Sequence, residues 1–177
     1  MRFQELPIDG AYLIELQPIH DRRGFNARAW SAQEYEAHGL VNRIVESNVI
    51  FNRAKATLRG MHYQVPPMAE AKSFRVTHGA IYDVIVDIRQ DSPTHMEWTS
   101  VELAEDTPRM LYVPEGVAQG FMTLEDNTEV TYHVSASYSP GHGRGFRYDD
   151  PAFGIRWPLE PRVMSDKDRD WPGFSSG

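Results

Sequence analysis

Short hydrophobic runs, many of them alternating with polar residues, recur along the chain from residue 12 to residue 138. Alternation with a period of two places apolar side chains on one face and is typical of β-strands. Clusters rich in proline, glycine, asparagine and aspartate separate the runs, as expected of turns between antiparallel strands. The pattern predicts strands over 12–16, 43–50, 56–64, 72–78, 80–88, 96–103, 109–113, 118–124 and 128–138.

One segment departs from this pattern. Ser31 followed by Glu34 forms a capping box, and Gly39 supplies a C-terminal stop, so one short peripheral helix is predicted near residues 31–39. Short strands at regular spacing indicate an antiparallel sandwich or barrel, and we predict an all-β jelly roll. From Ser139 onward the chain is rich in glycine, proline and charge. We expect this tail to be irregular structure packed on the sandwich.

The composition is that of an ordinary globular protein. With 177 residues, of which 41% are hydrophobic, the chain is long enough to form a single domain over 1–177. It has no cysteine, no apolar run long enough to cross a membrane and no signal-peptide pattern at its start, so we expect a cytoplasmic protein. The formal charge of -7 argues against a nucleic-acid partner but leaves room for a small phosphorylated ligand.

Residues 57–64 place several reactive groups on one predicted strand. The run contains a cation, a glycine, an imidazole, a phenol and an amide. Strict alternation would place His62 and Gln64 on one face of the strand and Arg59 on the other. A polar pair would then point toward a possible core, which suggests a binding site.

Two other predicted strands carry polar groups among apolar ones. Lys72 shares a face with Phe74, and Tyr132 shares a face with Tyr138, about 20 Å away along the strand. Taken alone, the lysine suits a solvated rim and each tyrosine suits a packed core. Together with His62, however, Lys72 and Tyr132 supply a base, a cation and an acid.

The chain resembles the dTDP-4-dehydrorhamnose 3,5-epimerase family from about residue 21 to residue 168. The segments that carry the resemblance are Leu58–Gln64, Tyr82–Arg89, Val113–Ala118 and Tyr148–Pro151. The resemblance implies a cupin-type jelly roll and a homodimer in which N-terminal segments exchange between subunits. It also implies a nucleotide-linked 4-keto-6-deoxy sugar as substrate, with no cofactor and no metal.

The resemblance also implies roles for individual residues. His62 would be the base that removes a proton next to the ketone, and Lys72 would stabilise the oxyanion at C4. Tyr132 would return a proton to the opposite face, and Asp168 would orient His62. The substrate-binding positions implied by the resemblance are Arg23, Phe25, Arg28, Asn48, Arg59, Gln64, Gln119, Tyr138 and Lys167. Among these, Arg23 and Arg59 would neutralise the diphosphate, and Tyr138 would stack on the base.

Three positions depart from the family pattern. Gln119 replaces a histidine, Arg28 replaces a glutamate, and Glu46 stands where glutamine is usual. The proposed catalytic residues are intact, but the lining of the site is altered. The sequence therefore leaves open which nucleotide and which sugar are bound, and whether C3, C5 or both are inverted.

Two other functions are alternatives for a chain with this fold. A non-catalytic sugar-nucleotide binding module could keep the fold, and hydrogen isotope exchange from solvent would separate it from an enzyme. A metal-dependent cupin would need a histidine pair near the first motif and another histidine at the second. Those neighbourhoods here contain His62, Tyr63, Gln64 and Gln119, which offer one good ligand.

Overall fold

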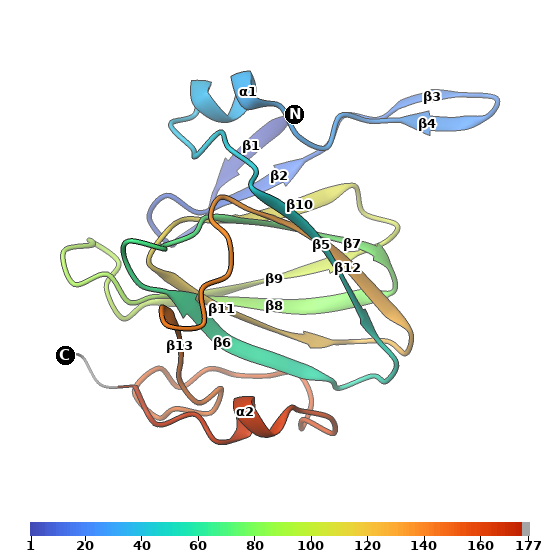
Figure 1. Ribbon diagram of the computed structural model, residues 1–177. Helices are drawn as coiled ribbons and strands as arrows, with labels where there is room; N and C mark the ends of the chain where they lie inside the picture. Colours follow the sequence, from blue (N-terminus) through green and yellow to red (C-terminus); the bar gives the residue numbers. More distant parts are fainter. Residues whose placement is uncertain (175–177) are drawn as a thin grey trace.

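The backbone forms two antiparallel sheets that face each other in the computed structural model, which describes residues 1–174 (Figure 1). The first sheet has six strands, in the order β1 (Arg2–Glu5), β2 (Tyr12–Glu15), β10 (Arg109–Val113), β7 (Lys72–His78), β12 (Thr128–Val134) and β5 (Glu46–Asn52). The second has five, in the order β13 (Gly143–Gly145), β6 (Leu58–Gln64), β11 (Val117–Thr123), β8 (Ala80–Asp87) and β9 (Trp98–Ala104). From β5 to β12 the chain passes repeatedly between the sheets, which confirms the predicted all-β jelly roll.

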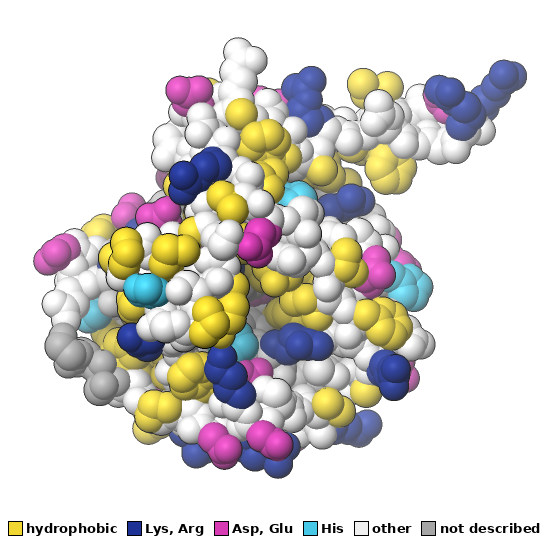
Figure 2. Space-filling model, in the orientation of Figure 1, with side chains coloured by type: hydrophobic (Ala, Val, Ile, Leu, Met, Phe, Trp, Pro, Cys, Tyr) yellow, Lys and Arg dark blue, Asp and Glu magenta, His cyan; other side chains and the backbone are white. Residues whose placement is uncertain are grey.

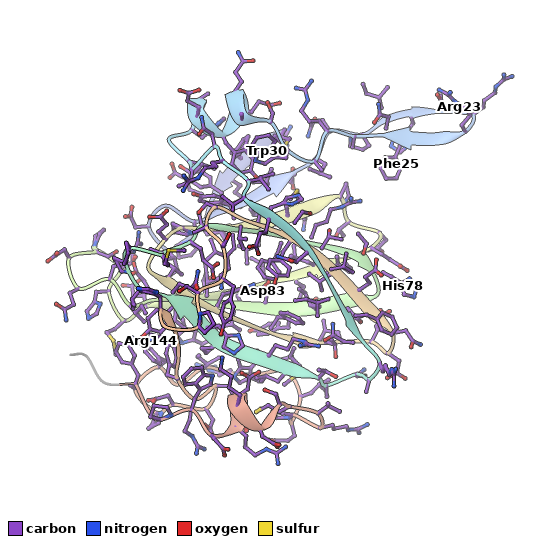
Figure 3. All side chains as sticks on the ribbon, viewed as in Figure 1. Arg23, Phe25, Trp30, His78, Asp83 and Arg144 are labelled. Atoms are coloured by element: carbon purple, nitrogen blue, oxygen red, sulfur yellow. The ribbon has the colours of Figure 1, made fainter. Side chains whose placement is uncertain are left out.

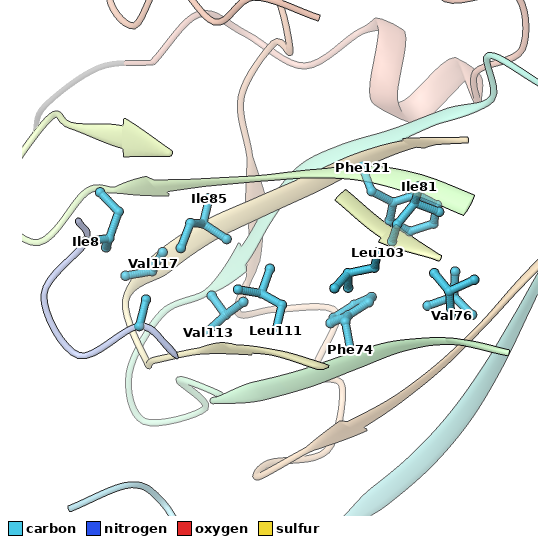
Figure 4. Packing of buried hydrophobic residues seen from close by; sticks show 12 residues of the cluster. Ile8, Phe74, Val76, Ile81, Ile85, Leu103, Leu111, Val113, Val117 and Phe121 are labelled. Atoms are coloured by element: carbon cyan, nitrogen blue, oxygen red, sulfur yellow. The ribbon is translucent and has the colours of Figure 1, made fainter. Parts of the chain in front are cut away.

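Apolar side chains from both sheets fill the space between them. Phe74 and Val76 of β7 and Leu111 of β10 pack with Ile81 and Ile85 of β8, and each is at most 4% exposed (Figure 4). Removing this apolar surface from water is the main stabilising contribution to the sandwich. Close packing also fixes the sheets relative to each other, so polar side chains on neighbouring strands are held in place.

The predicted peripheral helix is confirmed as α1 (Ala32–Ala37). The Ser31 side chain accepts a hydrogen bond from the Glu34 N–H, as the capping box predicts. Tyr35 is buried against Ile14 and Met110, so α1 covers the outer face of the six-stranded sheet.

The prediction of a single helix and an irregular tail was wrong in two respects, because the tail contributes β13 to the five-stranded sheet and also forms a helix. The tail contains a second short helix, α2 (Asp166–Arg169), which begins at Ser165. The Ser165 Oγ accepts a hydrogen bond of 3.0 Å from the Asp168 N–H. A four-residue helix has no apolar periodicity to reveal it in a sequence. The rest of the tail packs on the outer face of the five-stranded sheet. There, Phe146 of the tail and Met61 of β6 belong to one buried apolar cluster.

The predicted strands agree with the observed ones to within a few residues, except over 128–138, and the observed β1 and β13 were not predicted. The strand predicted over 128–138 ends at Val134, so Tyr138 lies beyond β12 and the predicted shared face with Tyr132 was wrong. The hairpin of β3 (Ile19–Asp21) and β4 (Gly24–Asn26) was not predicted as strands. It extends away from the sandwich (Figure 1).

Candidate active site

A cavity of about 420 Å³ is lined by residues from both sheets and from the C-terminal tail. Figure 2 shows charged and histidine side chains beside a hollow near the middle of the face in view. All the predicted site residues line the cavity except Arg23, Phe25 and Arg28. Its charged and polar lining residues include Glu46, Asn48, Arg59, His62, Gln64, Glu70, Lys72, Gln119, Tyr132, Tyr138, Arg144, Lys167 and Asp168.

His62 on β6 and Asp168 on α2 form a close pair although 106 residues separate them. The His62 Nε2 lies 2.5 Å from the Asp168 Oδ1. Burial pushes the pKa of Asp168 upward, but hydrogen bonds from His62 and the Ser165 hydroxyl and the backbone of Gly60 bring it below its ordinary value. Asp168 is therefore ionised at neutral pH and can only accept, so the proton in this hydrogen bond is carried by the His62 Nε2.

The predicted faces of β6 were wrong, because the strand contains a bulge. His62 pairs with Gln119, but Arg59 pairs with Phe121, so three residue steps on β6 match two on β11. The additional residue breaks the alternation, and Arg59 and His62 both line the cavity instead of lying on opposite faces. Gly60 lies in the bulge with a φ of +134°, and a Cβ there would lie 2.4 Å from the Cα of Gly120. Only glycine fits at residue 60, where β6 passes so close to the backbone of β11.

Lys72 begins β7 in the sheet opposite His62 and is 8% exposed. Its Nζ donates to the backbone oxygen of His62 at 3.4 Å. It also lies 3.4 Å from the Glu70 Oε1, in a pair whose side chains are only 9% and 11% exposed. The sequence interpretation gave Glu70 no role, because it lies between two predicted strands and outside every motif.

Tyr132 projects into the cavity from β12. Its ring stacks on Phe74, with centroids 4.8 Å apart and planes inclined by 10°. Burial raises the pKa of the Tyr132 hydroxyl, and the negative charges of Glu70 and Glu46 raise it further, against a smaller opposing effect of Arg59. Tyr132 therefore stays protonated at neutral pH and can act as an acid.

Gln119 contacts a buried carboxyl group beneath the cavity. Its Nε2 lies 3.0 Å and 2.9 Å from the two carboxyl oxygens of Asp83, which is fully buried on β8 (Figure 3). Burial raises the pKa of Asp83 to about 8, although the Gln119 hydrogen bond and the Lys72 charge act in the opposite direction. Sequence reasoning did not single out Asp83, although it lies within one of the segments that carry the family resemblance.

Gln64 was predicted to bind the substrate, but its side-chain amide is hydrogen-bonded within the protein. Its Nε2 donates to the backbone oxygens of Met68 and Ser137 and to the Glu70 carboxylate, at 3.0 to 3.2 Å. Its Oε1 accepts from the Ser139 N–H at 2.7 Å. The amide is engaged with the protein and connects the segments around the cavity.

Lys167 and Tyr138 meet at the rim of the cavity. The Lys167 Nζ lies 3.4 Å from the Tyr138 hydroxyl and 5.3 Å from the ring centroid of Trp171. The Arg59 Nε donates to the Asn52 Oδ1 at 2.8 Å, which orients the guanidinium. Trp171, like the cavity-lining Arg144, lies in the tail and carries no strand or motif signal that could have identified it.

The structure does not bring Arg23, Phe25 and Arg28 to this cavity. Arg23 and Phe25 lie on the projecting hairpin (Figure 3). Arg23 donates to Asp21, and Phe25 is 57% exposed. The Arg28 Nη1 donates to Glu34 at 2.8 Å beside α1.

Over residues 1–174, no cluster of three or more histidine, cysteine, aspartate or glutamate side chains is arranged to hold a metal ion. No helix in that range has both the length and the apolar character needed to cross a bilayer.

Comparison with known proteins gives one consistent result. The family model for dTDP-4-dehydrorhamnose 3,5-epimerase matches residues 5–176. A Sinorhizobium fredii protein of that name is 39% identical over 175 residues, which cover 98% of this chain and 90% of that protein.

Two solved structures extend the similarity to the fold. The Bacillus anthracis enzyme of the same name, with TDP and PPi bound, superposes with a TM-score of 0.94 at 39% identity, covering 98% of this chain and 99% of that one. A Legionella pneumophila 3,5-epimerase in complex with dTDP-4-keto-L-rhamnose gives a TM-score of 0.90 at 33% identity, covering 97% and 92%.

Proposed function

Because the chain belongs to the dTDP-4-dehydrorhamnose 3,5-epimerase family, we propose that it is an isomerase that inverts a nucleotide-linked 4-keto-6-deoxy sugar at C3, C5 or both. The observation that carries this proposal is the His62–Asp168 pair in a cavity that Lys72 and Tyr132 also line. A C4 ketone acidifies the protons on C3 and C5, because the resulting carbanion is an enolate. The cavity supplies the base, cation and acid that this chemistry needs.

His62 removes the proton through Nδ1. The Nε2 proton stays in the hydrogen bond to Asp168, so Nδ1 is the nitrogen of the neutral ring that accepts the substrate proton. Proton transfer creates an imidazolium, whose positive charge the Asp168 carboxylate stabilises at a distance of 2.5 Å.

Lys72 stabilises the enolate, and Tyr132 completes the inversion. The Lys72 Nζ extends from the six-stranded sheet to within 3.4 Å of the His62 carbonyl oxygen, so the cation lies close to the residue that acts as the base. Tyr132 comes from the sheet opposite His62. A proton that leaves toward His62 and returns from Tyr132 enters on the other face of the carbon, which inverts its configuration.

The cationic rim suits the nucleotide. We assign Arg59 and Lys167 to the diphosphate and Asn48 to a further polar contact. Tyr138, 57% exposed beside Lys167, offers an open ring on which a base can stack.

We propose that the projecting hairpin contacts a second copy of the chain in a homodimer. Its exposed Ile19 and Phe25 are apolar groups that a second copy of the chain could cover, and we propose that Arg23, Phe25 and Arg28 contact the substrate held by the partner. That the chain is one domain and acts in the cytoplasm stays a prediction.

Hydrogen exchange with solvent tests the proposed function. The protein is incubated in deuterated water with a panel of nucleotide-linked 4-keto-6-deoxy sugars, and the C3 and C5 protons are followed by NMR. Exchange at both carbons is expected of a double epimerase, and exchange at one carbon of a single-centre enzyme. His62→Ala should abolish exchange while the protein stays folded. Absence of exchange with every sugar would instead support a non-catalytic binding module.

A further inference from the structure

Glu70 is an acidic residue inside the cavity with two defined contacts. Its side chain is 11% exposed. One carboxylate oxygen lies 3.4 Å from the Lys72 Nζ, and the other accepts a hydrogen bond of 3.2 Å from the Gln64 Nε2. Since Gln64 also donates to the backbone at Met68 and Ser137, the carboxylate is tied to the segments on both sides of the cavity.

A carboxylate at the position of Glu70 is unfavourable for the reaction unless it has another role. Under the proposed function, the reaction builds negative charge on the substrate oxygen, and a second negative charge nearby opposes that step. A buried ammonium without a counter-ion is also costly, and lysine is a point charge on a flexible stem. The Lys72 Nζ contacts Glu70 and the His62 carbonyl oxygen, and together these contacts fix its direction.

We propose that Glu70 is a positioning residue that anchors the Lys72 ammonium beside His62, so that the cation faces the developing oxyanion. This inference rests on the proposed function. Without Glu70, the lysine stem can reorient within the cavity, and the cation is no longer placed where the charge develops. A displacement of about 1 Å at such a site costs up to roughly a hundredfold in rate.

Glu70 has a second effect, on the proton of Tyr132. The charged groups that act on this hydroxyl are Glu70, Glu46 on β5 and Arg59 on β6. After burial, Glu70 is the largest cause that raises the pKa of Tyr132, so neutralising Glu70 lowers that pKa. The acid form of Tyr132 is then lost at a lower pH, and the alkaline limb of the rate profile moves in the same direction.

The experiment compares Glu70→Gln with Glu46→Gln in the full-length protein. Both changes remove a negative charge near Tyr132, but only Glu70 contacts Lys72. Two readouts are used: the pH profile of kcat and KM, and the ¹⁵N signal of the Lys72 ammonium, assigned by its loss in Lys72→Arg. For Glu70→Gln we expect kcat to fall roughly tenfold to a hundredfold with a much smaller change in KM, and the Lys72 signal to shift. For Glu46→Gln we expect the alkaline limb to move while the Lys72 signal stays in place.

Other outcomes would overturn the anchoring role or separate it from the proposed function. An unchanged Lys72 signal in Glu70→Gln, or an equal shift in Glu46→Gln, overturns the anchoring role. Glu70→Asp keeps the charge but shortens the reach, so it should lower kcat without moving the alkaline limb. It also provides a second test if Glu70→Gln folds poorly. If the wild type exchanges no substrate proton while Glu70→Gln alone shifts the Lys72 signal, the proposed function fails and the anchoring contact stands.

Discussion

Replacing Asp168 with asparagine tests the central pair of the site with little change of shape. Asp168 is 5% exposed, and its carboxylate lies 2.5 Å from the His62 Nε2. The backbone N–H of residue 168 would still donate to the Ser165 Oγ, so the start of α2 is preserved. The substitution removes the charge that stabilises the imidazolium formed in the reaction.

The size of the effect follows from the geometry. Two unit charges whose centres lie about 4 Å apart interact by about 4 kcal/mol at an effective dielectric constant of about 20. The His62 side chain is 39% exposed, and solvent screening reduces this to about 2 to 3 kcal/mol. At 1.36 kcal/mol per tenfold change, Asp168→Asn should slow proton abstraction by roughly 30- to 160-fold.

The assay is the initial rate of deuterium incorporation at C3 and C5 of the best substrate, measured by NMR at saturating sugar nucleotide. Asp166→Asn is the matched control, because Asp166 lies in the same helix but does not line the cavity. In a His62→Asn background, Asp168→Asn should have almost no further effect, since the charge to be stabilised is absent. A rate for Asp168→Asn within threefold of the Asp166→Asn rate would refute the role of the pair.

Four other substitutions are predicted together. Gly60→Ala should lower the free energy of unfolding by about 3 to 5 kcal/mol in denaturant titrations, because its Cβ would lie 2.4 Å from the Gly120 Cα. Gly154→Ala, with a φ of +59° and open space around it, should cost only about 1 kcal/mol. Tyr132→Phe should retain deuterium exchange but lose inverted product, measured by NMR of the sugar; full product formation would contradict the acid role. Asp83 has a pKa raised to about 8 from 3.8, so its stabilising contribution is complete below about pH 4 and lost as pH rises through about 8. Asp83→Asn should therefore become more stable relative to the wild type over that range, and parallel unfolding curves would count against a raised pKa.

Strand positions could be predicted because the hydrophobic alternation is a local property. β7 and β10 match their predicted ranges, and α1 begins at the predicted cap. The faces of β6 could not be predicted in the same way. The bulge depends on Gly60 crossing Gly120, and these two glycines meet only after both strands have paired.

The members of the site differ in how much the sequence could reveal. His62 and Lys72 could be singled out as polar groups on apolar strands, whereas Asp168 was assigned only through the family resemblance. Glu70 carries no local signal, because its importance comes from the Lys72 ammonium two residues away and from Gln64 on another strand. Residues in irregular segments are placed by tertiary contacts, and a periodic pattern cannot find them.

Carboxylates favour the protonated form of the acid–base group on both faces of this cavity. Asp168 accepts a hydrogen bond from His62, so its charge stabilises the protonated ring and favours uptake of a proton there. Glu70 and Glu46 act on Tyr132 through charge alone, and they oppose the loss of its proton. The same effect serves two roles, because it keeps the Tyr132 phenol protonated as the acid and stabilises the imidazolium that His62 forms when it acts as the base. Inversion requires this division, because two bases or two acids on opposite faces of a carbon cannot remove a proton from one face and deliver it to the other.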